Sequence, residues 1–179
     1  MTAVSPELSH PVRLDRIGTT PMAVSIVPDQ RVRAALAERF DLIAVDSLRA
    51  ELTIQRRREN GWIEVTGEIR ADVVQTCVVS TDPVPATVHA EISELFDDSG
   101  DIGTDEIVLD PLADSPEPVA GDSIDVGEVA AQALGLALEP YPRVPGAVPE
   151  LTVSDPGDTR SGSPFAKLAS IKGRPTGEG

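Results

Sequence analysis

The chain has few of the residues that build catalytic, metal and disulfide sites. Its 179 residues include one cysteine, Cys77, and two histidines, His10 and His89. A single cysteine cannot form an intramolecular disulfide, and neither histidine has ligand spacing to Cys77, whereas a structural zinc site needs about four ligands. No stretch reaches the roughly 18 apolar residues of a membrane helix, and residues 1–17 lack the apolar run and basic flank of a signal peptide. The sequence therefore predicts a cytoplasmic protein that is not an enzyme, carries no cofactor and contacts no membrane.

Aromatic residues are also scarce, because the chain has only three Phe, one Tyr and one Trp. Apolar residues nevertheless make up 40% of the sequence, which is enough for a core. That core must be built from Val, Ile, Leu and Ala, which suit strands and closely packed helices. Sixteen prolines and fourteen glycines predict many turns, and the length fits a single domain.

Basic residues are nearly absent from the middle of the chain. Residues 61–150 contain 19 Asp and Glu against two Lys and Arg, whereas residues 1–60 and 151–179 each carry a net charge of +1. The middle segment thus contributes −17 to a total of −15. A charge of this size repels nucleic-acid phosphates and attracts basic surfaces, so it predicts a basic protein as partner.

The first part of the chain has the alternating hydrophobicity of strands. Apolar side chains recur at every second position over residues 48–54, 63–73 and 84–92, with weaker strands near residues 11–17 and 22–27. Asn60-Gly61 predicts a hairpin turn, because both residues tolerate positive φ. The alternation falters around Val74, where we expect a turn or bulge at Gln75 and Thr76. The pattern predicts an antiparallel meander of about five to seven strands, which either curls into a small barrel or packs beside helices.

Two segments have helical periodicity. Residues 29–40 carry one apolar face, and Asp125-x-x-Glu128 resembles a capping box before a helix over residues 125–138. Residues 97–123 are acidic and predict a long loop, interrupted by one short strand at residues 106–109.

These elements predict the α+β fold class. The expected organisation is a flexible N-terminus over residues 1–10, one domain over residues 11–150, and a linker with a short amphipathic box over residues 151–179. An antiparallel sheet would be flanked by two or three helices, with an acidic loop and a flexible tail leaving it.

Several segments together resemble the YceD-like family, which is named for large ribosomal RNA subunit accumulation. The central segment contains Val65-x-Gly67 and Ala71-Asp72-Val-Val-Gln-Thr-Cys77-Val-Val-Ser, followed by Pro83 and an alternating strand. Further segments agree with the family in order and spacing, at residues 11–17, 36–42, 125–143 and 163–168. The resemblance covers most of residues 8–172 and is closest to the alphaproteobacterial-type branch, which has fewer cysteines.

The resemblance implies a role in accumulation or processing of large-subunit ribosomal RNA, without a defined activity. Many family members carry C-x-x-C at the central strand and later cysteines, which has prompted predictions of metal binding. Here Ser80 stands at the second position and no later cysteine exists, so the metal site does not transfer to this sequence. The motif and binding positions marked by the resemblance are Gln75, Thr76, Cys77, Glu128, Tyr141, Arg143 and Phe165.

Structural explanations compete with functional ones at these positions. Cys77 continues the apolar phase of its strand, which favours a small buried core residue over a nucleophile. Glu128 has no acid or base partner in the sequence, so a helix-capping role is favoured. Phe165, Leu168 and Ile171 form an apolar stripe if the tail is helical, and would dock on the protein's own sheet or on a partner.

Two functional hypotheses follow. In the first, the chain is a non-catalytic factor that supports accumulation or processing of large-subunit ribosomal RNA by binding a basic ribosomal or RNA-processing protein through its acidic face. In the second, it binds RNA directly through Arg56, Arg57 and Arg58, its only basic cluster. These arginines could instead neutralise the acidic block or cover a strand end, and no broad basic face accompanies them. The first hypothesis is favoured.

Overall fold

The computed structural model describes residues 6–100 and 116–148 of the chain. The sequence expectations for the strand at residues 106–109 and for the C-terminal box with Phe165 lie outside these residues. The chain divides after Ala147, so the description below concerns the first unit.

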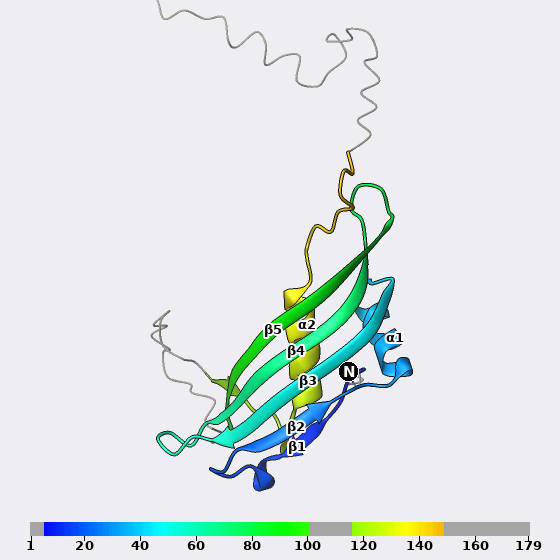
Figure 1. Cartoon of the computed structure of the whole chain (residues 1–179). Coiled ribbons are helices and arrows are strands. Elements are labelled where there is room, and N and C mark those ends of the chain that lie inside the picture. The colour runs from blue at the N-terminus through cyan, green and yellow to red at the C-terminus, as the bar shows by residue number, and fades with distance from the viewer. Residues whose placement is uncertain (1–5, 101–115, 149–179) are drawn as a thin grey trace, which may run out of the picture. The chain divides into compact units, whose positions relative to one another are not determined.

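Five strands form one sheet in the order β2–β3–β4–β5–β6 (Figure 1). Strands β2 (Met22–Ile26), β3 (Ala44–Arg56), β4 (Ile63–Thr76) and β5 (Pro83–Asp97) are antiparallel, whereas β6 (Glu117–Pro118) runs parallel to the end of β5. A second sheet pairs β1 (Pro11–Arg13) with β7 (Ser123–Asp125), and a 3-10 turn at Leu14–Arg16 follows β1. The antiparallel meander is confirmed. The barrel alternative is wrong, because β2 and β6 end an open sheet.

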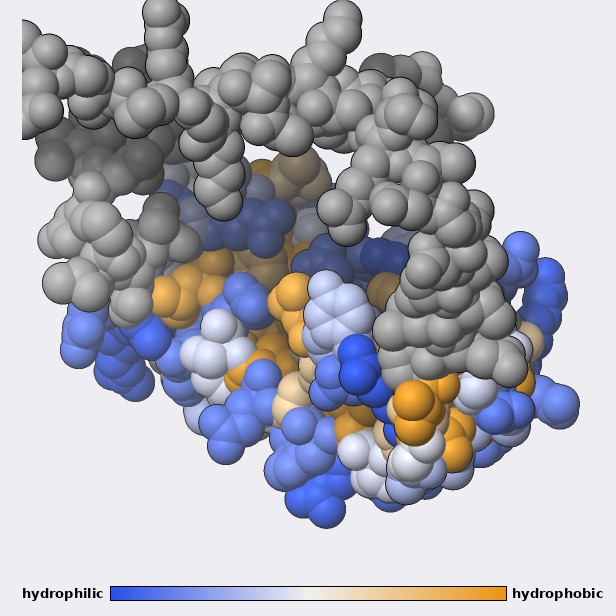
Figure 2. All heavy atoms as spheres, turned by 90° about the horizontal axis from the view of Figure 1, so that it is seen from above, coloured by the Kyte–Doolittle hydropathy of each residue, from blue (hydrophilic) through white to orange (hydrophobic). Residues whose placement is uncertain are grey.

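Two helices cover one face of the sheet. Helix α1 (Gln30–Arg39) packs on β3, and α2 (Val126–Ala137) packs on β5 and β4, behind the sheet in Figure 1. The side chains of β4 that face these helices are apolar and buried, whereas most of those between them are polar. Viewed from one end of the sheet, hydrophobic residues gather in the middle of the view and hydrophilic residues surround them (Figure 2). The α+β class predicted from the sequence is confirmed, and no helix of the described residues is long and apolar enough to cross a membrane.

Each helix begins after an aspartate that caps it. Asp29 accepts a hydrogen bond from the amide of Val32 at 2.9 Å, and Asp125 accepts one from the amide of Gly127 at 3.0 Å. Asp125 also accepts from the amide of His10 at 2.7 Å, which ties the N-terminal segment to α2. Leu8 is already buried, so packing starts ahead of the domain boundary expected at residue 11.

The expected bulge at Gln75 and Thr76 is wrong. The ladder between β4 and β5 is unbroken up to Thr76, and the register shift lies instead in β3, between Val45 and Ser47. The alternation of buried positions along β4 continues through Gln75, although this residue is polar. The Nε2 of this buried side chain donates to the carbonyl of Glu139 at 2.8 Å, whereas its Oε1 has no partner within the described residues.

The hairpin predicted at Asn60-Gly61 is confirmed, since β3 and β4 pair antiparallel on either side of it. The loop between β3 and β4 has six residues, and only Gly61 takes positive φ, at 79°. Asn60 instead accepts a hydrogen bond through Oδ1 from the amide of Trp62 at 3.2 Å. The loop between β4 and β5, residues 77–82, repeats this geometry with Thr81 at φ 64° in the place of Gly61.

Gly67 is required by the close approach of β3 to β4. A Cβ atom at this position would lie only 2.1 Å from the backbone oxygen of Glu51, and φ is 156°. We expect Gly67→Ala to lower the free energy of unfolding by about 1–3 kcal/mol, because backbone must move to admit the methyl group. Urea unfolding followed by circular dichroism measures this change.

Gly18→Ala is the matched control for that substitution. No atom lies within 4 Å of a Cβ atom built on Gly18, so the free energy of unfolding should change by less than about 0.5 kcal/mol. Equal effects of the two substitutions would refute the proposed contact with Glu51.

Candidate protein-binding surface

The outer face of the sheet largely neutralises its own charge. Glu51, Glu68 and Glu91 lie in one row across β3, β4 and β5, and Arg49, Arg70 and His89 form the next row. Like charges opposite one another on neighbouring strands are unfavourable, so contacts between the rows offset them. The carboxylate of Glu68 lies 3.0 Å from both His89 and Arg70, which lower its pKa. Arg49 and Ser25 bind Glu51 and lower its pKa in the same way.

The carboxylates left without a partner gather at one edge of the sheet. In the central acidic segment, four side chains have no hydrogen bond or ion pair within the described residues, and three of them are Glu91, Glu94 and Glu117. All three are exposed, the first two on β5 and the third on β6 beside it. We call these three residues the edge cluster. Within the described residues, it is the place where several unpartnered carboxylates of the acidic segment lie close together.

An apolar groove lies beneath this edge, between β5 and α2. It consists of two adjoining pockets of about 210 and 230 Å³, which share Val129 and Gln132 of α2. All three residues of the edge cluster line it, and among the described residues no lysine or arginine does. The other apolar side chains of the lining are Ala90, Ile92, Phe96, Pro118, Val119, Ala120, Ile124, Ala133, Leu136 and Ala137. We call this feature the β5–α2 groove.

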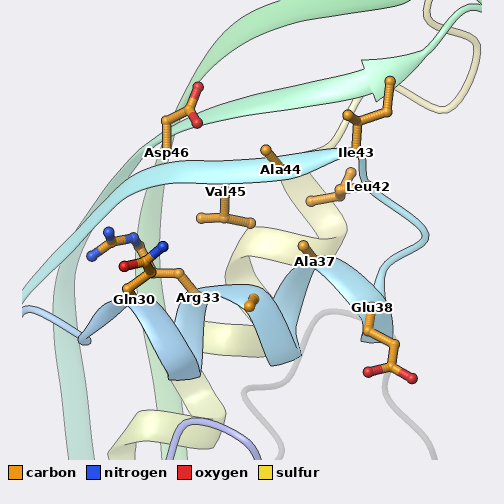
Figure 3. A pocket seen from close by; sticks show the side chains of 10 residues that line it. Gln30, Arg33, Ala37, Glu38, Leu42, Ile43, Ala44, Val45 and Asp46 are labelled. Atoms are coloured by element: carbon orange, nitrogen blue, oxygen red, sulfur yellow. The ribbon is translucent and has the colours of Figure 1, made fainter.

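A second groove of about 450 Å³ lies between α1 and the start of β3 (Figure 3). Val45 points from β3 toward α1, and Arg33 of α1 lies at the same end of the groove as Asp46. Arg33 donates through Nη1 to the carbonyl of Pro28 at 2.9 Å, and its buried Nε has no partner within the described residues. Because Arg33, Glu38 and Asp46 all line it, this groove carries both signs of charge and does not select a partner by charge.

The structure brings five of the residues marked by the family resemblance together at the end of β4. Three contacts hold the extended segment after α2 to the hairpin: Gln75 Nε2 to Glu139 O at 2.8 Å, Val78 N to Pro142 O at 2.9 Å, and Val144 N to Cys77 Sγ at 3.4 Å. Gln75 and Cys77 are therefore buried anchors. Tyr141 and Arg143 are exposed on the segment that they hold, and Thr76 is exposed on β4.

The expected burial of Cys77 is confirmed, since the residue is 1% exposed. Its Sγ accepts hydrogen bonds from the amides of Ser80 and Val144, each at 3.4 Å. The side chain of Ser80 and these amides lower the pKa of the Cys77 thiol to about 7, because they stabilise the thiolate. Across the described residues, no three Cys, His, Asp or Glu side chains converge in a way that could hold a metal ion.

Glu128 connects the two helices and does not join the Cys77 hairpin. Both of its carboxylate oxygens accept from Arg39 of α1, at 2.7 and 2.8 Å, and Arg39 also pairs with Glu7 at 3.0 Å. Arg39 lowers the pKa of Glu128, and the ion pair is about three-quarters buried at the carboxylate. The cap predicted here is supplied by Asp125, and the partner of Glu128 lies 89 residues away in sequence.

Two of the three arginines proposed for RNA contact are bound to carboxylates. Arg56 makes two hydrogen bonds to Asp98, at 2.7 and 2.8 Å, and donates to the carbonyl of Gly61 at 2.8 Å. Arg57 pairs with Glu64 at 2.6 Å and lowers the pKa of that carboxyl group. Arg58 is exposed. The cluster thus secures the ends of β3 and β4, and its positive charge is largely neutralised.

Sequence reasoning missed the edge cluster and the groove, although two residues signalled them. Glu94 stands where the inward alternation of β5 calls for an apolar residue, opposite the buried Val65. Leu136 lies off the apolar stripe of α2 and is 87% exposed. A charge in an inward position and a large apolar residue in an outward one both indicate that this edge is not closed by the chain described here.

Comparison with known proteins identifies one family. The model of the family described as Large ribosomal RNA subunit accumulation protein YceD matches residues 65–172, which is more than half of the chain. The match contains β4 from Val65 onward, β5, α2 and the described lining of the β5–α2 groove, whereas α1 and Arg56–Arg58 precede it. No curated protein and no solved structure matches the chain.

The lowered pKa of Cys77 makes the stability of the fold depend on pH. Because the folded-state pKa is about 7, below the ordinary value of 9.0, the thiolate stabilises the fold fully above pH 9 and this contribution is lost as the pH falls through 7. We therefore expect the deficit of Cys77→Ser relative to the natural chain to be larger at pH 9 than at pH 6. Urea unfolding at both pH values measures it, and an equal deficit at both would contradict the assigned hydrogen bonds.

The Arg39–Glu128 pair should stabilise the fold at neutral pH. We expect Glu128→Gln to lower the free energy of unfolding by about 1 kcal/mol at pH 7. Since Arg39 lowers the pKa of Glu128 from its ordinary value of 4.5, the pair contributes fully above pH 4.5 and its contribution disappears as the pH falls further. A double-mutant cycle with Arg39→Gln measures the coupling, and additive effects of the two substitutions would show that the pair contributes nothing.

Proposed function

Because the chain belongs to the YceD family of large ribosomal RNA subunit accumulation proteins, we propose that it supports accumulation of this RNA as a binding factor and not as an enzyme. It does so by binding a basic ribosomal or RNA-processing protein through its acidic surface. The family name gives the RNA that accumulates. The proposal that the protein acts by binding a basic partner is supported by the charge of its surface.

The edge cluster is the observation that carries this proposal. Glu91, Glu94 and Glu117 are exposed, have no partner within the described residues and lie beside an apolar groove with no basic lining. Acidic residues around an apolar surface attract a basic protein over a long range and then allow close contact with it. The groove lies within the part of the chain that matches the family.

Direct RNA binding receives less support from the arrangement of charges. The guanidinium groups of Arg56 and Arg57 are engaged by Asp98 and Glu64, so they would have to exchange carboxylates for phosphates. The edge cluster repels phosphates on the other side of the sheet. Direct RNA binding is therefore the alternative that the capture experiment below distinguishes from protein binding.

A capture experiment on the full chain tests the proposal. The tagged protein is incubated with cell lysate at low and high salt, with and without ribonuclease, beside the variant Glu91→Gln/Glu94→Gln/Glu117→Gln. We expect basic large-subunit or RNA-processing proteins to be recovered at low salt despite ribonuclease. The variant should recover about tenfold less of them, since three carboxylates near a partner's cations are lost.

The matched control removes the same number of charges elsewhere. Glu38, Asp46 and Glu59 are exposed and lie outside the edge cluster, so Glu38→Gln/Asp46→Asn/Glu59→Gln changes the net charge equally. Recovery by this control should equal that of the natural chain. The proposal fails if both variants behave alike, and recovery that disappears with ribonuclease would assign the function to RNA contact.

A further inference from the structure

We propose that the open edge of β5 is a strand-addition site, at which an extended segment of a basic protein joins the sheet and lays apolar side chains into the β5–α2 groove. This inference rests on the proposed function for the basic character of the partner. It adds where the partner binds and which atoms hold it.

The backbone of β5 presents unused hydrogen-bonding groups along this edge. The carbonyl of Asp97 points away from β4, because it accepts from the amide of Val119 at 2.9 Å. Successive residues of a strand alternate in direction, so the amides and carbonyls of the other odd-numbered residues of β5 point the same way. Those of Thr87, His89, Glu91 and Ser93 have no strand beside them among the described residues, since β6 pairs only with Phe96 and Asp97.

Strand β6 shows that this edge accepts a further strand. It pairs in parallel with the last two residues of β5 and begins at Glu117, opposite Phe96, so within the described residues the edge before Phe96 has no strand beside it. At the other end of β5, Pro83 and Pro85 blunt the edge in the way that exposed edges are usually protected. Between these limits, from Thr87 to Ser93, no proline interrupts the row of donors and acceptors.

The groove supplies a place for one face of an added strand. Every second side chain of such a strand would project toward α2, beside Ala90 and Ile92 of β5. Leu136, 87% exposed on α2, stands at the side of the groove and would be covered by these side chains. Burial of this exposed leucine by an apolar residue is favourable, so an apolar contact reinforces the backbone hydrogen bonds.

The glutamates decide in favour of a basic partner over a second copy of the chain. Glu94 projects on the groove side, because it lies opposite the buried Val65, and Glu91 projects on the outer face. An added strand therefore meets a carboxylate on each face and is stabilised by cationic residues on both. Two copies joined through this edge would place the same glutamates near one another, which is unfavourable.

A peptide of alternating valine and lysine is a direct probe of the site, because as a strand it has one apolar and one cationic face. The full chain is labelled with nitrogen-15 and amide hydrogen exchange is measured at low salt with and without the peptide. We expect exchange to slow at His89, Glu91 and Ser93. The amide of Ile92, which already faces β4, should not change. A peptide held only by side-chain charges would leave all four amides unaltered.

Substitutions separate the backbone contact from the charge. Ser93→Pro removes one outward amide and leaves the ladder with β4 intact, so it should weaken peptide binding at least tenfold, whereas Ser93→Ala keeps the amide and should bind normally. Leu136→Ser, at an exposed position, should weaken binding several-fold without any change in the sheet. This second variant keeps the test valid if Ser93→Pro lowers stability, which urea unfolding reports.

The outcomes distinguish this inference from the proposed function. Strand addition is overturned if the peptide does not bind, if the amides stay unprotected, or if Ser93→Pro and Ser93→Ala bind equally. It is also overturned if protection arises without peptide and grows with protein concentration, since a second copy would then occupy the edge. In each case, loss of basic proteins on substitution of the edge cluster would still uphold the proposed function. Absence of such proteins from the capture experiment would refute the function alone.

Discussion

The two-residue alternation of β4 is the constraint on which the rest of the structure depends. This strand pairs along its whole length with β5 and over nearly all of it with β3, and its inward side chains are buried under the helices. A shift of one residue would expose that entire set, so the register of both neighbours is fixed by the core. The register in turn places Glu94 on the groove side and directs the amides of Glu91 and Ser93 outward. The candidate binding edge is thus a consequence of core packing in the neighbouring strand.

Polar contacts at both ends add to the buried apolar face of α2 in fixing where the helix lies on this sheet. Asp125 binds the amide of His10 at the start of the helix, and Glu128 binds Arg39 of α1 one turn later. After the helix, Gln75 holds the carbonyl of Glu139. These partners come from three distant parts of the chain, and each compensates a polar group that packing would otherwise leave without a bond. Because both ends of α2 are fixed, the position and shape of the groove between its exposed side and β5 are set by the fold.

The sequence predicted those elements whose signal is periodic and failed where long-range pairing decides. The alternation of residues 63–73 and 84–92 and the stripe of α2 correctly gave strands and a helix, because burial of one face imposes a period. The bulge was placed at Gln75 and Thr76 because the alternation falters around Val74, yet the bond from Gln75 to Glu139, which holds this polar side chain in a buried position, is not visible in the sequence. Asn60-Gly61 indicated a turn and its glycine, but the six-residue loop depends on the backbone geometry of both strands. An open sheet edge produces no periodic pattern in the sequence, so the candidate binding site was not predicted.

The net charge of the sequence predicted that the binding surface is acidic, but not where on the structure it lies. Among the described residues of the central segment, several carboxylates are bound by arginines, a capping position or hydroxyl groups, and these pairs explain how a sheet with rows of like charges remains stable. Of the four described carboxylates that remain without a partner, three lie at one edge of the sheet. The unpaired glutamates repel other copies of the same edge while attracting cations, so one feature both protects a free strand and selects what joins it. An acidic composition can therefore encode a specific site when the remaining charge is confined to backbone that is still able to pair.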